Sequence, residues 1–158
     1  MKITFLLVGE TEFSFVKEGM GIYEKRLTHY IDYKRVELPI PRKKGNQWDP
    51  LLVKEKEGEL ILKQIKPTDE VILLDERGDS FGSVDWARFL ERKMNAGTRH
   101  LIFVTGGAFG FSDAVYERAN GKLSLSKMTF SHQIIRLFFT EQLYRAFTIL
   151  RGEPYHNE

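Results

Sequence analysis

Three glycines cluster in the segment FVTGGAFGFS, residues 103–112, directly after an apolar run. Glycine has no Cβ atom, so its backbone can approach a flat ligand closely or adopt unusual dihedral angles. The spacing G-G-x-x-G, over Gly106, Gly107 and Gly110, matches neither the dinucleotide fingerprint nor the phosphate-binding loop, which needs a following lysine. The segment therefore indicates either a ligand-binding loop of another kind, or a turn that requires glycine for its own geometry.

Polar residues recur along a C-terminal helical pattern, which follows the alternating segment LSLSKMTFS at 123–131. His132 and Arg136 are four residues apart, so they lie one turn apart on one face of a helix. This face and its border continue with Thr140, Tyr144, Glu141 and Arg145. The stripe indicates either a solvent-exposed side of the helix, or a wall of an active site or a subunit contact.

The chain ends in RGEPYHNE, residues 151–158, which carries an aromatic ring and an imidazole. Terminal residues are usually poorly ordered, yet Tyr155 and His156 have the groups needed to stack on a loop or a base and to hydrogen-bond with it. The other catalytic signatures fail: the four histidines show no metal-ligand spacing, no serine sits in a nucleophile elbow, and Asp75-Glu76 is interpreted as a turn. We therefore expect neither a hydrolase nor a metal site.

Length and composition fit a single domain, residues 1–158, with no cysteine for disulfides, thiolate catalysis or a cysteine zinc site. The apolar run at 3–8 is too short for the central region of a signal peptide, and no stretch is apolar over about 18 residues. We therefore expect a cytoplasmic protein with no membrane contact. The net charge is only +2. A basic stretch nevertheless forms either a solvated face or an RNA-binding surface: Lys25, Arg26, Lys34, Arg35, Arg42, Lys43 and Lys44.

Strand and helix patterns alternate along the chain. Strands are predicted at 3–8, 36–40, 71–78 (ending in a turn), 100–105 and 122–126, the second weakened by Pro39 and so placed near a sheet edge. Helices are predicted over 16–27, from Asp49 as N-cap to about Lys66, from Ser83 as N-cap to about Met94, after Ser112 as N-cap, and over 132–151. This alternation predicts one α/β domain with a mostly parallel sheet and helices on both faces. Ligands of such sheets bind beyond the carboxyl ends of the strands, where the glycine segment lies.

Five segments together resemble one family over essentially the whole chain: MKITFLLVG, VILLDERG, FVTGGAFGFS, LSLSKMTFSHQIIRLFFTEQLYRAF and RGEPYH. In this order they are similar to the small bacterial ribosomal large-subunit methyltransferases of the SPOUT class, which methylate N3 of a pseudouridine in 23S rRNA. The middle three segments make the match specific. Two positions depart from the family pattern: Ser131 stands where many relatives have proline, and Asn157 where a basic residue commonly follows Tyr-His.

The resemblance implies a fold and a co-substrate. The family's C-terminal part forms a trefoil knot, one of the rare exceptions to unknotted topology, and the knotted segment makes the pocket for S-adenosylmethionine. Matched position by position, the cofactor-binding residues are Leu74, Gly106, Leu125, Ser126, Lys127, Met128, Thr129 and Phe130. On this interpretation the glycines leave room for the cofactor, and no metal is needed.

The resemblance also implies a homodimer, in which each pocket is completed by the other subunit, and 23S rRNA within the ribosome as partner. The candidate catalytic residues are His156, Tyr155 and Arg136. His156, or else His132, could remove the N3 proton, Arg136 or Arg145 could stabilise charge developing on the base, and Tyr155 could stack on that base. Two alternatives remain: a methyltransferase of the same class that acts on a transfer RNA base, and a non-catalytic ribosome-binding protein.

Overall fold

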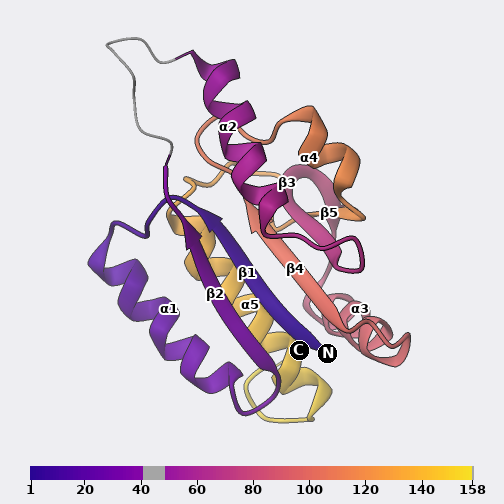
Figure 1. Ribbon diagram of the computed structural model, residues 1–158. Helices are drawn as coiled ribbons and strands as arrows, with labels where there is room; N and C mark the ends of the chain where they lie inside the picture. The colour runs from indigo at the N-terminus through magenta and orange to yellow at the C-terminus, as the bar shows by residue number, and fades with distance from the viewer. Residues whose placement is uncertain (41–48, 158) are drawn as a thin grey trace.

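Five parallel strands form the centre of the computed structural model, which describes residues 1–40 and 49–157 (Figure 1). The strands are β1 (Lys2–Val8), β2 (Asp32–Leu38), β3 (Glu70–Ser80), β4 (His100–Thr105) and β5 (Gly121–Ser124), in the order β2-β1-β4-β3-β5. The helices are α1 (Ser14–Leu27), α2 (Pro50–Lys63), α3 (Ser83–Asn95), α4 (Asp113–Arg118) and α5 (Ile134–Leu150). All strand pairs are parallel and a helix follows each strand, so the predicted α/β class is confirmed.

The interior strand β1 separates two hydrophobic cores, because successive side chains of a strand point to opposite faces of the sheet. Ile3, Phe5 and Leu7 pack on the side covered by α1, α3 and α5. Leu6 and Val8 pack on the other side, with α2 and α4. Helices therefore cover both faces of the sheet, as the sequence predicts.

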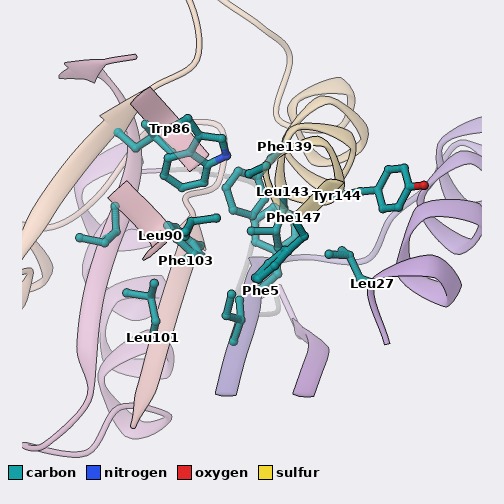
Figure 2. Packing of buried hydrophobic residues seen from close by; sticks show 14 of the residues in the cluster. Phe5, Leu27, Trp86, Leu90, Leu101, Phe103, Phe139, Leu143, Tyr144 and Phe147 are labelled. Atoms are coloured by element: carbon teal, nitrogen blue, oxygen red, sulfur yellow. The ribbon is translucent and has the colours of Figure 1, made fainter. Parts of the chain in front are cut away.

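The core beneath α3 and α5 is rich in aromatic rings (Figure 2). Phe139 of α5 packs against Phe5 and Phe103, with ring centroids 4.5 and 4.9 Å apart. Trp86 of α3 packs edge-on against Phe103 at 5.7 Å, and its indole N–H donates to the backbone oxygen of Gln142 at 3.1 Å. Rings of this size dominate the energetics of a core, so they hold α3 and α5 firmly on one face of the sheet.

The predicted edge location of β2 and the predicted start of α2 are confirmed, but β2 covers Asp32–Leu38 and not 36–40. β2 is an edge strand and ends at Leu38, before Pro39. Asp49 caps α2, since its carboxylate accepts the N–H of Leu51 at 2.9 Å. Within residues 1–40 and 49–157, none of the helices has the length and apolar content needed to cross a membrane.

Two further local predictions are wrong. Residues 75–78 do not end the strand in a turn: β3 continues to Ser80, because it pairs with β5 on both sides of a register shift beyond Leu74. The N-cap of α3 is Gly82, and Ser83 is the first helical residue. The long β3 brings the residues after Leu74 to the edge of the sheet where ligands bind.

Candidate active site

A cavity of about 770 Å³ opens at the carboxyl ends of β3, β4 and β5. Sites for small ligands have volumes of roughly 300–1,000 Å³, so the cavity can enclose a nucleoside-sized molecule. Its walls come from residues 74–77, from the glycine loop (residues 105–111), and from residues 123–126 and 128–132 between β5 and α5. Lys54, Asp113, Tyr116 and Ile135 complete the lining. The position is the one expected for a parallel α/β sheet.

The predicted cofactor-binding residues gather around this cavity. All of them except Lys127 line it: Leu74, Gly106, Leu125, Ser126, Met128, Thr129 and Phe130. They combine aliphatic and aromatic side chains with hydroxyl and backbone polar groups, a lining that suits a flat ring carrying polar substituents. The structure thus brings together residues that lie as far apart in the sequence as 74 and 130, and their role in binding stays a prediction.

The glycines of the loop meet the protein's own atoms. A Cβ on Gly106 would lie 3.3 Å from the backbone of Gly110 and from the ring of Phe111. Gly110 has a φ of +78°, in the left-handed region that favours glycine, and its N–H donates to the oxygen of Gly107 at 3.2 Å. A Cβ on Gly107 would lie 2.5 Å from both carboxylate oxygens of Glu57 on α2. The sequence suggested that these glycines leave room for a ligand. In the structure, the space beside Gly106 is occupied by the loop itself, and the space beside Gly107 by Glu57 of α2.

Serine side chains shape the segment between β5 and α5. Ser124 Oγ donates to the backbone oxygen of Ser126 at 2.9 Å, and Ser126 Oγ accepts the N–H of Met128 at 2.9 Å. This turn presents the side chain of Met128 at the rim of the cavity, where it is 78% exposed. Ser131 Oγ accepts the N–H of Ile134 at 3.2 Å, so the start of α5 is fixed without a proline at this position.

A polar cluster that the sequence analysis missed forms another part of the wall. The hydroxyl of Tyr116 donates to Asp75 Oδ2 at 2.5 Å, while Arg77 donates to Asp75 Oδ1 at 3.3 Å and to the Tyr116 hydroxyl at 2.6 Å. Burial acts to raise the pKa of the Asp75 carboxyl, but the hydrogen bonds from Tyr116 and Arg77 outweigh it and hold that pKa below its usual range. Asp75 is therefore a fixed negative charge beside the cavity. An acidic residue directly after an apolar strand was the available signal.

The candidate catalytic residues are divided between the two ends of α5. His132 lies at the cavity end, and Tyr155 and His156 lie at the other end. His132 lines the cavity. Tyr155 packs near the far end of the helix, with its ring centroid 4.8 Å from that of Tyr144, and His156 follows it. At 1.5 Å per residue, Tyr144 lies about 14 Å along α5 from Ile135, which lines the cavity. Within one chain the tail therefore lies at the amino ends of the strands, where the hydroxyl of Tyr30, just before β2, donates to Glu153 at 2.5 Å.

Arg136 is fully buried and does not line the cavity. Its guanidinium donates to Thr11 Oγ1 and to the backbone oxygens of Val8, Gly9 and His132. Thr140 and Tyr144, further along the predicted polar stripe, are buried as well. These three positions thus face neither solvent nor the cavity, and the placement of Arg136 favours a role in holding the structure around the site.

The basic stretch is described only in part. Its exposed members are Lys25, Arg26 and Lys34. Arg35 pairs with Glu24 and Glu37 at 3.5 and 3.7 Å. Residues 41–48 lie outside the described residues, and with them the predictions for Arg42, Lys43 and Lys44. In the part of the chain that the structure describes, no three acidic or histidine side chains are grouped so that they could hold a metal ion.

Comparison with known proteins agrees with the resemblance over the whole length. Residues 1–156 match the family described as "Predicted SPOUT methyltransferase". Proteins named "Ribosomal RNA large subunit methyltransferase H" are similar from end to end. The one from Cytophaga hutchinsonii is 48% identical over 157 residues, 99% of this chain and 100% of the relative. Those from Parabacteroides distasonis and Christiangramia forsetii are 49% and 50% identical, and the matches cover at least 99% of each chain. The chain therefore belongs to the SPOUT methyltransferase family.

Proposed function

We propose that this chain, acting as a single domain in the cytoplasm, methylates N3 of a pseudouridine in 23S rRNA and takes the methyl group from S-adenosylmethionine. The observation that carries the proposal is the full-length identity of 48–50% to proteins whose name states methylation of large-subunit ribosomal RNA. The choice of N3 and of a pseudouridine rests on the resemblance of the cavity segments to the family motifs.

The cavity suits S-adenosylmethionine in size and in lining. Leu74, Leu125 and Phe130 would enclose the adenine ring, and the backbone of Gly106 would contact its polar edge. Asp75 places a negative charge where the cationic end of this molecule can lie. When bound, S-adenosylmethionine supplies a methyl group that its sulfonium already activates, so the protein's task is to align the reactants.

Alignment and proton removal are the two steps left to the side chains. The methyl group would pass to N3 in place of its proton, and the residues around the cavity would hold the two reactants in alignment, which supplies several kcal/mol. The N3 proton passes to a general base, which contributes roughly 10²–10⁴-fold. His156 is the proposed base, with His132 as the alternative, and Tyr155 would stack on the target base. Arg136, with its guanidinium buried, would position the start of α5.

The tail would act on the cavity of a second subunit. Tyr155 and His156 lie at the end of α5 that is remote from the cavity of their own chain, so the proposed homodimer must bring them to the partner's cavity. Exposed aromatic rings offer a surface for such a dimer: Phe13 and Phe15, stacked at 5.5 Å, and Phe138 on α5 are 46–55% exposed. Sedimentation of the purified protein should give the mass of two chains, and a monomer would contradict this arrangement.

We also propose that the C-terminal part is knotted, as the resemblance implies. The chain leaves β5 at one edge of the sheet and continues to α5, which packs against α1 and α3. Residues 125–133 must therefore cross the ends of the strands. At the start of this crossing the backbones of β3 and β5 are so close that a Cβ on Gly78 would lie 2.6 Å from the backbone of Lys122 and Leu123. A crystal structure in which residues 125–133 pass outside the loop between β3 and α3 would exclude the knot.

Methylation of purified RNA substrates tests the function directly. With S-adenosylmethionine carrying a labelled methyl group, ribosomes or large subunits should accept label in 23S rRNA, and mass spectrometry should place it on N3 of one pseudouridine. Label in transfer RNA alone would favour the alternative substrate. If calorimetry detects no binding of S-adenosylmethionine, the non-catalytic ribosome-binding alternative replaces the enzyme.

A further inference from the structure

Glu57 is a carboxylic acid buried behind the glycine loop, in a helix to which the sequence analysis assigned no chemistry. Its side chain projects from α2, the residue is 5% exposed, and Glu57 itself does not line the cavity. The N–H of Gly107 interacts with the carboxylate, and the position of a Cβ on Gly107 lies 2.5 Å from both carboxylate oxygens. Glu57 therefore contacts the backbone of the loop on the side away from solvent.

The neighbouring contacts hold α2 closely against the glycine loop. Gly58, the next residue of α2, packs so closely against Ser112 at the far end of the loop that a Cβ there would overlap Ser112 Oγ. Among the described residues, Glu57 Oε2, Ser112 Oγ and Thr105 Oγ1 are buried oxygens without a hydrogen-bond partner. Each such oxygen costs stability. The three oxygens lie around one loop, so α2 encloses the glycine loop closely between Thr105 and Ser112.

Contact with Gly107 determines how the preceding peptide is oriented. The N–H of Gly107 and the C=O of Gly106 belong to one peptide group, which is planar and trans, so the two bonds point in opposite directions. When the N–H is directed at Glu57, the carbonyl of Gly106 points away from Glu57. Gly106 lines the cavity, and glycine by itself would leave this peptide free to rotate.

We propose that Glu57 is a positioning residue for the cofactor pocket, which holds the Gly106–Gly107 peptide so that the Gly106 carbonyl is oriented to accept a hydrogen bond from the bound nucleoside. The inference rests on the proposed function and adds to it a residue from α2. Glu57 acts through the loop and touches neither the cofactor nor the RNA.

Substitutions at Glu57 separate positioning from mere packing. Glu57→Met keeps the approximate volume but removes the acceptor, so the Kd for S-adenosylmethionine, measured by calorimetry, should rise about tenfold, the effect of one lost hydrogen bond. Glu57→Gln keeps an acceptor oxygen and should bind within about twofold of wild type. Glu59→Gln, at an exposed position of the same helix, is the matched control. The KM for ribosomes should not change in any of these variants.

The outcomes are distinguishable from failure of the proposed function. Wild type that binds no S-adenosylmethionine would remove the proposed function and this inference together. Wild-type binding with an unchanged Kd in Glu57→Met, even with a lower melting temperature, would leave Glu57 a packing residue and overturn the inference alone. If Glu57→Met does not fold, Glu57→Asp, which withdraws the carboxylate by one methylene, takes its place with the same expectation of weaker binding.

The pH dependence of stability gives an independent check of the buried contact. Burial raises the pKa of Glu57 above its ordinary value of 4.5, and the N–H of Gly107 opposes this only in part. The elements around Glu57 carry Lys54, on the preceding turn of α2, Asp113 of α4, and the apolar Leu6 and Val8 of β1. Among the described residues, no charged neighbour contributes to the rise in the pKa of Glu57.

The sign follows from proton binding. Between 4.5 and the raised folded pKa, the folded state holds a proton that the unfolded state has lost, so this carboxyl makes stability fall as pH rises through that window. Glu57→Gln should remove this slope and should be more stable than wild type above the window, in urea denaturation at a series of pH values. Parallel profiles of wild type and Glu57→Gln would show that the carboxyl is not buried against the loop, and would overturn the inference.

Discussion

At the scale of single residues, Arg136 is a buried cation that ties two segments together. Its guanidinium donates to the backbone oxygens of Val8 at 2.7 Å and Gly9 at 3.1 Å, and to Thr11 Oγ1 at 2.9 Å. Thr11 in turn donates to Glu37 at 2.7 Å, so the positive charge faces a carboxylate through one hydroxyl. Burial lowers the pKa of Arg136, and Glu37 opposes this. The clamp joins the chain after β1 to the start of α5, which frames the cavity.

Replacing Arg136 by methionine should destabilise the protein strongly. The backbone oxygens of Val8 and Gly9 would stay buried without their donor, and removal of one partner from a buried charged network typically costs about 3–5 kcal/mol. Urea denaturation measures this loss. The control is Arg88→Met, which breaks a surface pair with Asp85 and should change the free energy of unfolding by less than about 1 kcal/mol. Equal losses in the two variants would contradict the clamp.

At the scale of elements, two helices contain glycines whose surroundings are opposite. Gly21 of α1 is exposed, and nothing lies within 4 Å of the position of its Cβ. Gly58 of α2 is buried: a Cβ there would overlap Ser112 Oγ and lie 3.3 Å from Val115 of α4. The absence of a side chain at Gly58 thus lets α2 approach α4 closely, and this contact supports the glycine loop from behind.

The same substitution should therefore have opposite effects in the two helices. Gly21→Ala should raise the free energy of unfolding by about 0.5–1 kcal/mol, because alanine has the higher helix propensity. Gly58→Ala should lower it by about 1–3 kcal/mol, because the overlap with Ser112 exceeds the gain in propensity. Denaturant titration of both variants measures the two signs, and stabilisation by Gly58→Ala would show that α2 and α4 are not in close contact.

At the scale of the whole molecule, the position of the tail decides how an active site can be assembled. α5 begins at the cavity and runs antiparallel to the strands, so its length separates His156 from the cavity of its own chain. If the tail takes part in catalysis, each active site of the proposed dimer contains the cavity of one subunit and the tail of the other. The dimer is then required for activity as well as for stability.

Mixed dimers test this arrangement. Gly106→Val, in the cavity, and His156→Ala, in the tail, should each be inactive alone, while His156→Ala should still bind S-adenosylmethionine. After the two variants have exchanged subunits, about half of the dimers are mixed and each has one intact site, so activity should recover to about one quarter of wild type. Methylation assays before and after exchange measure the recovery. If activity does not recover, the tail serves its own chain, whereas activity of His156→Ala before exchange would show that the tail has no role.

Much of the architecture was predictable, because it depends on neighbours in the chain. The apolar runs at 3–8 and 100–105 predict buried strands, and both lie in the centre of the sheet. Asp49 before Pro50 predicts the start of α2. The glycine segment and residues 123–132 were expected at the same edge of the sheet, since the carboxyl ends of parallel strands meet there, and both line the cavity.

Contacts between distant segments were not predictable in this way. The spacing of Arg136 places it on one helical face, but only the packing of α5 against β1 and α1 shows that this face is buried. Nothing in the neighbourhood of Glu57 or Gly58 in the sequence indicates that α2 lies behind the glycine loop. The role of Asp75 was missed because its strand was expected to end in a turn, whereas pairing with β5 extends it.

By itself, then, the sequence determined the class of fold, the order of its elements and the family, because periodicity, capping and motif spelling are properties of short stretches. The tertiary structure alone decided which faces meet: that Arg136 is enclosed, that Glu57 touches Gly107, and that His156 lies away from its own cavity. These depend on packing between residues far apart in the chain, where the summed burial of whole faces outweighs any local preference.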